Sequence, residues 1–121
     1  MVAAEAGKAR EGWKVLPTWA NRSKFRYSGC VSSGTDIEYG IEFRRKASVS
    51  ADEYRRLLEH FVKKGEVPIG TGFANRPTNS VGQWLVDHRG TKPVIASYVG
   101  PILIAEGYAK RGNQSDLIHF V

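Results

Sequence analysis

The chain contains very little sulfur. Of its 121 residues one is a cysteine, Cys30, and one is a methionine. A single cysteine cannot form an intramolecular disulfide, and the scattered His60, His88 and His119 do not complete a metal-ligand spacing with it. We therefore expect neither a disulfide framework nor a bound metal or other cofactor. We interpret Cys30 as a buried, unreactive thiol in a reducing compartment.

Long hydrophobic runs are also missing. The longest apolar stretch, Pro93–Ala105, is too short to span a bilayer and is interrupted by Gly100 and Pro101. Residues 1–12 are small and polar and lack the apolar core of a secretory signal. We predict a flexible N-terminal arm over residues 1–12, followed by a single domain over residues 13–121. We expect a cytoplasmic protein, nuclear if its source is eukaryotic, with no membrane partner.

Acidic residues are outnumbered by basic ones. Eighteen Lys and Arg face twelve Asp and Glu, which gives a net charge of +6 and a pI near 9.7. Residues 1–34 hold six basic and two acidic side chains, residues 35–68 hold seven of each, and residues 69–121 hold five and three. Such a charge favours a polyanionic partner. If this partner is a nucleic acid, its surface should join the two ends of the chain.

Two segments near the N-terminus alternate in polarity at period two. Residues 24–28 alternate basic with aromatic side chains, and residues 37–43 alternate apolar with acidic or small ones. This periodicity predicts two half-buried strands, and an antiparallel β-hairpin is their simplest pairing. We interpret the acidic residues as partners in ion pairs with the cations opposite them, rather than as ligands of a nuclease metal. The charged residues are Lys24 and Arg26 on one strand and Asp36, Glu38 and Glu42 on or beside the other.

A helix is predicted to begin at Ser50. Ser50 and Glu53 have the spacing of a capping box, in which each side chain bonds the backbone amide of the other residue. Five apolar residues then recur at helical spacing, and Lys63-Lys64-Gly65 is typical of a helix end. The apolar residues are Tyr54, Leu57, Leu58, Phe61 and Val62.

Further elements are predicted toward the C-terminus. A second cap at Ser80 and Gln83 begins a short helix, and Gly100-Pro101 should kink or split the helix after it. The predicted order is a short edge strand at Val67–Ile69, a loop at 70–79, a helix at 80–88, a helix at 94–105, and strands at 108–111 and 117–121.

This order of elements resembles a winged helix-turn-helix over residues 50–121. The predicted fold class is therefore α+β, with the N-terminal hairpin packed on a winged-helix-like C-terminal part. The resemblance implies non-catalytic nucleic-acid binding, to duplex DNA rather than RNA, with the helix at 94–105 offered to the major groove. Residues near that helix, at the root of the wing and in the only three-residue basic run are the predicted contacts. They are Arg89, Lys92, Ser97, Lys110, Arg111, Arg44, Arg45 and Lys46.

Three alternatives stay open. The helix at 94–105 has no Arg, Asn or Gln that could read a base, so it could simply be a core helix. Its apolar character, together with Trp13 and Trp19, also suits a homodimer or another protein interface. Polar side chains in the loop 70–79 could instead frame the cleft of a small enzyme, although no nucleophile is recognisable. These loop residues are Asn75, Arg76, Thr78 and Asn79.

Overall fold

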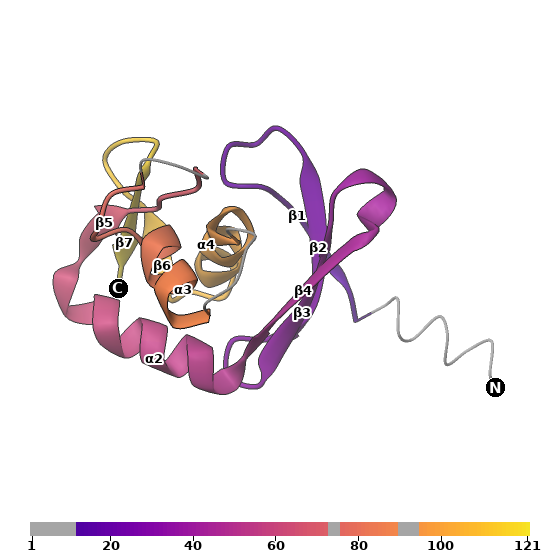
Figure 1. The fold of residues 1–121 in the computed structure, drawn as a ribbon, viewed down its shortest axis with the longest axis horizontal. Coiled ribbons are helices and arrows are strands. Elements are labelled where there is room, and N and C mark those ends of the chain that lie inside the picture. The colour runs from indigo at the N-terminus through magenta and orange to yellow at the C-terminus, as the bar shows by residue number, and fades with distance from the viewer. Residues whose placement is uncertain (1–11, 73–75, 90–94) are drawn as a thin grey trace.

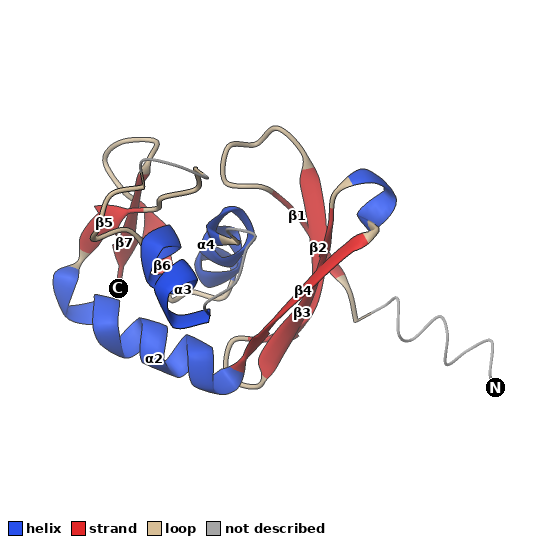
Figure 2. Ribbon diagram, viewed as in Figure 1, coloured by secondary structure: helices blue, strands red, loops and turns tan. Residues whose placement is uncertain are grey.

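The computed structural model describes residues 12–72, 76–89 and 95–121. These residues form a mixed α+β structure with one four-stranded sheet and one three-stranded sheet (Figures 1 and 2). Helix α4 (Ala96–Ala105) lies between the two sheets, and helix α2 (Ala51–Phe61) connects them along one side (Figure 1). The α+β class predicted from the sequence is confirmed. The predicted N-terminal arm falls outside the described residues except for Gly12.

The four-stranded sheet is an antiparallel meander. The predicted hairpin is confirmed as its two central strands, but one strand on each side was not predicted. The outer strands carry weak signals, because the first ends in proline and the last has Val49 as its only bulky apolar residue. In sheet order the strands are β1 (Lys14–Pro17), β2 (Lys24–Cys30), β3 (Gly34–Tyr39) and β4 (Arg45–Ser50).

The two faces of this sheet differ as the alternation predicts. Phe25, Tyr27 and Ile37 are buried on the inner face. On the outer face Arg26 lies opposite Glu38, and its Nε donates to the Glu38 carboxylate at 2.7 Å. The predicted cross-strand ion pair is therefore confirmed for this pair of residues.

The prediction of a strand continuing through Phe43 is wrong. Strand β3 ends at Tyr39, because Gly40 adopts φ 79° and residues Ile41–Phe43 form the short 3₁₀ turn η1. Glu42 pairs with Arg44 inside this turn rather than with a cation of β2. The period-two pattern of polarity continues past the end of the strand, and it contains no information about the backbone angle at Gly40. As a result Ile41 points into solvent instead of the core.

Helix α2 begins where the capping box predicts. The Glu53 amide donates to the Ser50 hydroxyl and the Ser50 amide donates to the Glu53 carboxylate, both at 3.1 Å. Tyr54, Leu57 and Phe61 are buried, so the apolar stripe faces the core. The chain continues through the 3₁₀ turn η2 (Val62–Lys64), where Val62 is exposed.

Replacement of Ser50 by alanine is expected to reduce the free energy of unfolding by about 1 kcal/mol, because the first turn of α2 loses its side-chain acceptor. Urea unfolding monitored by circular dichroism measures this loss. The matched control is Ser48→Ala on the same strand, whose exposed side chain should be replaceable within about 0.5 kcal/mol. Equal losses in the two variants would mean that the cap does not stabilise the helix.

The remaining elements follow the predicted order of helix, strand, helix, helix, strand and strand. After α2 the three short strands form an antiparallel sheet in the order β5-β7-β6. The last strand in the sequence therefore lies in the middle of this sheet, between the strand that precedes α3 and the strand that follows α4. The elements are β5 (Glu66–Pro68), α3 (Val81–Arg89), α4, β6 (Ala109–Arg111) and β7 (Leu117–Phe120).

The second predicted capping box is half formed. The Gln83 amide donates to the buried Ser80 hydroxyl at 3.1 Å. The Gln83 side chain does not reach back to Ser80, because its oxygen accepts from Arg76 Nε at 3.1 Å and its nitrogen donates to Asp87 at 2.8 Å. One end of the 70–79 loop is thus attached to α3.

The predicted split of this helix is wrong, since α4 runs continuously from Ala96 to Ala105 with Pro101 inside it. Proline has no amide hydrogen, so the Ser97 carbonyl lacks its helical donor. The Trp19 amide donates to that carbonyl at 3.0 Å. At Gly100 a Cβ atom would come within 2.8 Å of the Trp19 ring. Pro101 and Gly100 therefore both allow the β1–β2 loop to approach the helix closely.

Candidate nucleic-acid interface

The helix predicted to enter the major groove is largely covered by the chain itself. Tyr98 stacks on Tyr39 with a centroid distance of 4.5 Å and meets Phe25 edge to face at 5.2 Å. Ser97 is partly buried, and the apolar residues of the opposite face are fully buried. The packing alternative describes this helix well. The apolar surface that suggested a homodimer through α4 is occupied within the chain.

Trp19 joins the N-terminal sheet to the C-terminal part. Its side chain is 5 % exposed, and its Nε1 donates to the Ser115 carbonyl at 2.8 Å. The Arg111 guanidinium lies 3.9 Å from the centre of the Trp19 ring and donates to the Trp19 carbonyl at 2.8 Å. The stacking and the hydrogen bond fix the direction of Arg111, while its side chain remains exposed.

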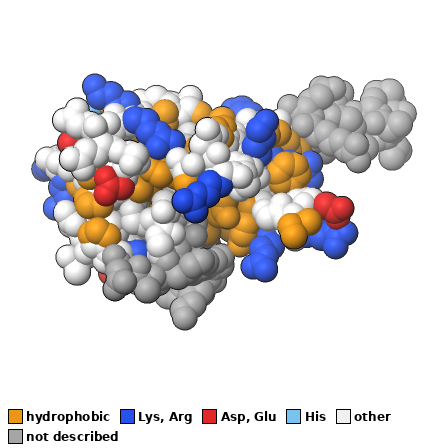
Figure 3. All heavy atoms as spheres, turned by 90° about the horizontal axis from the view of Figure 1, so that it is seen from above, with side chains coloured by type: hydrophobic (Ala, Val, Ile, Leu, Met, Phe, Trp, Pro, Cys, Tyr) orange, Lys and Arg blue, Asp and Glu red, His pale blue; other side chains and the backbone are white. Residues whose placement is uncertain are grey.

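Three loops gather at one end of the molecule, which we call the loop end: residues 18–24, 40–45 and 111–116. The first two loops lie there because β2 and β3 are antiparallel neighbours, so β2 begins and β3 ends at the same end of the sheet. The first and third line a hollow of about 450 Å³ that includes Arg22, Asn21, Arg111 and Ser115. Figure 3 looks down on this end and shows Lys and Arg side chains spread across it.

The loop end carries more positive than negative charge. It holds five basic and two acidic residues, and one of the acids, Glu42, is paired with Arg44. Four of the basic residues come from the β1–β2 loop, the start of β2 and the turn between β3 and β4, and one comes from the C-terminal third. The basic residues are Arg22, Lys24, Arg44, Arg45 and Arg111.

The predicted contact residues are therefore not all in one place. Arg44, Arg45 and Arg111 lie at the loop end. Arg89 is only 19 % exposed and donates to Glu53 at 2.7 Å, which joins α3 to α2. Lys92 lies outside the described residues.

Lys110 and Lys46 lie on sheet faces. Lys110 pairs across β6 and β7 with His119, in a hollow of about 330 Å³ that Arg111 also lines. Lys46 faces Glu38 on the outer side of the meander. Arg22 and Lys24 also lie at the loop end but are not among the residues predicted from the sequence, although Asn21-Arg22-Ser23 has the composition of a turn whose side chains are exposed.

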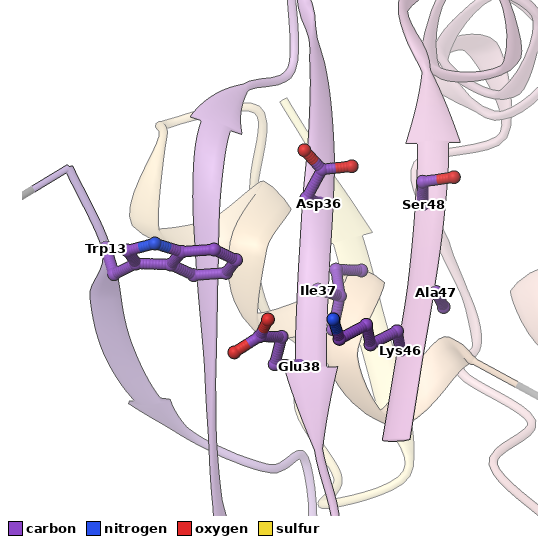
Figure 4. A pocket seen from close by; sticks show the side chains of 7 residues that line it. All are labelled: Trp13, Asp36, Ile37, Glu38, Lys46, Ala47 and Ser48. Carbon is purple, nitrogen blue, oxygen red and sulfur yellow. The ribbon is translucent and has the colours of Figure 1, made fainter. Parts of the chain in front are cut away.

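The outer face of the meander has its own shallow hollow of about 370 Å³. Figure 4 shows Trp13 reaching across β2 toward Asp36 and Glu38, with Lys46 and Ser48 on the neighbouring strand. The Arg26 guanidinium lies 5.2 Å from the centre of the Trp13 ring, and it also bonds Glu38. The charges on this face are thus mostly compensated by one another.

A partly buried polar network surrounds the C-terminal end of α4. The Tyr27 hydroxyl and the Val31 amide each donate to the Glu106 carboxylate at 2.9 Å. The Tyr54 hydroxyl hydrogen-bonds Thr35 at 2.7 Å. Burial, and then the Glu106 carboxylate, raise the pKa of Tyr27 far above its usual value. Burial raises the pKa of Tyr54 as well.

These two tyrosines predict a loss of stability at alkaline pH. Their pKa values in the folded protein are higher than the value of about 10 in the unfolded chain, which therefore loses its phenolic protons first. The stabilisation is complete below about pH 10 and decreases above it, by up to about 1.4 kcal/mol per pH unit for each tyrosine. Urea unfolding at a series of pH values measures the slope. An equal slope in a Tyr27→Phe Tyr54→Phe variant would contradict this origin.

Other side chains with catalytic potential lie apart from the loop end. His60 and His88 both contact Trp84, at centroid distances of 6.2 and 3.9 Å, and burial lowers the pKa of His60. Cys30 is partly exposed, so the expectation of a buried thiol is wrong, and its hydrogen bonds with Ser32 and Ser33 lower the pKa of the thiol. Among the described residues no three His, Cys, Asp or Glu side chains are grouped to bind a metal.

The loop proposed for an enzyme cleft is only partly described, since Asn75 lies outside the described residues. Arg76 donates to the Gly72 carbonyl at 2.8 Å as well as to Gln83, so it holds the loop against α3. Thr78 and Asn79 are exposed.

Comparison of this chain with protein-family models, with curated protein sequences and with solved structures gave no match. Within the described part of the chain, no helix has both the length and the apolar character needed to cross a bilayer.

Proposed function

We propose that the protein is a non-catalytic nucleic-acid-binding protein and that it contacts duplex DNA with its loop end. In this proposal residues 50–121 are a winged-helix-like module and residues 111–116 correspond to its wing. The order of elements and the β5-β7-β6 sheet support this assignment. Since α4 is covered by the meander, we place the DNA contact on the wing and the loops beside it rather than on that helix.

One observation carries the proposal. Arg22 and Arg111 are far apart in the sequence but line one hollow together with Asn21 and Ser115. Exposed guanidinium groups and small polar side chains are the groups that bind phosphate oxygens in protein–DNA complexes. Arg44 and Arg45 extend the same end of the molecule. This arrangement suits contacts to a phosphate backbone more than the reading of bases.

Fluorescence anisotropy with a short labelled DNA duplex tests the proposal. We expect binding at about micromolar protein in low salt, and a plot of log K against log salt with a slope of about −0.9 for each phosphate neutralised. About three to five contacts would give a slope between roughly −3 and −4.5. Single-stranded DNA and duplex RNA of the same sequence should bind more weakly. Absence of duplex binding at low salt, or binding that is independent of salt, would remove the proposal.

A further inference from the structure

The turn between β3 and β4 presents an apolar side chain to solvent. Ile41, which begins η1, is 84 % exposed, the highest value among the exposed large hydrophobic residues of the described chain. The others are Val15, Val62 and Val121, which lie elsewhere in the chain. Three basic residues in a row, Arg44-Arg45-Lys46, follow the turn directly.

The turn that carries Ile41 is held in one shape. The Phe43 amide donates to the Gly40 carbonyl at 3.0 Å, and the Arg44 amide donates to the Ile41 carbonyl at 3.2 Å. Glu42 and Phe43 both adopt a φ of 57°, in the left-handed region. The Phe43 ring lies against the Arg26 guanidinium at 4.8 Å, which attaches the turn to the outer face of the sheet. Ile41 therefore projects from a fixed support.

We infer that Ile41 is a wedge that inserts between adjacent base pairs of duplex DNA and kinks it, while Arg44 and Arg45 bind the phosphates on either side. This inference rests on the proposed function. Proteins that bend DNA through the minor groove combine an inserted apolar side chain with neighbouring cations in this way. The β-branched side chain of isoleucine has few rotamers, so little freedom is lost when it inserts.

A duplex suits this turn better than an anionic lipid surface, which also attracts basic and apolar residues. A single small apolar group gives only marginal membrane attachment, and stable attachment needs a second one. Phe43 cannot be the second because it is packed on Arg26. On a duplex, by contrast, the loop end supplies further cations at Arg22 and Arg111.

A duplex with donor and acceptor dyes at its two ends tests the wedge. We expect the wild-type protein to increase energy transfer on binding, and Ile41→Ala to bind about tenfold more weakly without that increase. Ile41→Leu should restore both signals. Val62→Ala, which truncates an exposed valine on η2, is the matched control and should behave as the wild type. Because Ile41 contributes little to the core, the alanine variant is expected to fold normally.

The outcomes separate the wedge from the proposed function. If Ile41→Ala binds and bends the duplex as the wild type does, the wedge is wrong and DNA binding stands. If the wild-type protein does not bind the duplex, both are wrong. Flotation with vesicles of phosphatidylserine and phosphatidylcholine tests whether the turn binds lipid instead. Vesicle binding that depends on Ile41, with unchanged duplex bending, would assign the turn to lipid and overturn the wedge.

Discussion

Reversal of three charges at the loop end, Arg22→Glu, Arg44→Glu and Arg45→Glu together, is expected to weaken duplex binding by roughly 1,000-fold. A hydrogen bond to a charged group contributes about 1.5 kcal/mol. Three such losses amount to about 4.5 kcal/mol, or somewhat more than three powers of ten in affinity. The salt slope should also decrease by about one for each arginine that contacts a phosphate. Anisotropy titrations at several salt concentrations measure both quantities.

The control variant carries the same change of charge at another place. Arg56, Lys63 and Lys64 lie on α2 and η2, on the side of the molecule opposite the loop end in Figure 1. Their replacement by glutamate should weaken binding much less, through long-range repulsion alone, and should leave the salt slope almost unchanged. Equal losses in the two variants would mean that binding depends on net charge and that the loop end is not a defined site.

Truncation of Trp19 to alanine is expected to reduce the free energy of unfolding by about 3–5 kcal/mol, the usual cost for a buried tryptophan. The ring fills the space over Gly100, and the Arg111 guanidinium stacks on the ring. A loss of this size is a large part of the stability of a small protein. Urea unfolding monitored by tryptophan fluorescence and circular dichroism measures it.

Two further variants divide the contribution of Trp19. Trp19→Phe retains an aromatic ring but removes the Nε1 donor to Ser115, so it should be less destabilising than alanine. Trp13→Ala, at the partly exposed tryptophan of the outer face, should be destabilising by no more than about 1 kcal/mol. A Trp19→Ala variant as stable as Trp13→Ala would show that the two sheets are held together by other contacts.

The parts of the fold that could be predicted from the sequence depend on neighbours in the chain. The capping box of Ser50 and Glu53 and the apolar stripe of α2 lie within four turns of helix, so their pattern is visible in a few residues. The alternation of β2 and β3 is equally local. Strand β4 was missed because only Ala47 and Val49 face inward, and two small or medium side chains make no recognisable period.

The candidate site could be predicted only in part, because it depends on contacts between distant residues. Composition indicated that basic residues of the first and last thirds should share a surface, and the hollow with Arg22 and Arg111 brings two of them together. The covering of α4 could not be predicted, since it requires Trp19 to meet Ser97 and Gly100. The exposure of Ile41 depends on the backbone angle of Gly40, about which the polarity pattern contains no information.

Because the Trp19 amide donates to the Ser97 carbonyl, the exchange of its proton reports on the separation of the β1–β2 loop from α4. The amides inside the meander and inside α4 are protected by their own ladders, and they exchange with deuterium when those elements open. The Trp19 amide is protected by an acceptor on α4. Its exchange rate therefore measures how often the β1–β2 loop leaves the helix, even while both the sheet and the helix stay intact.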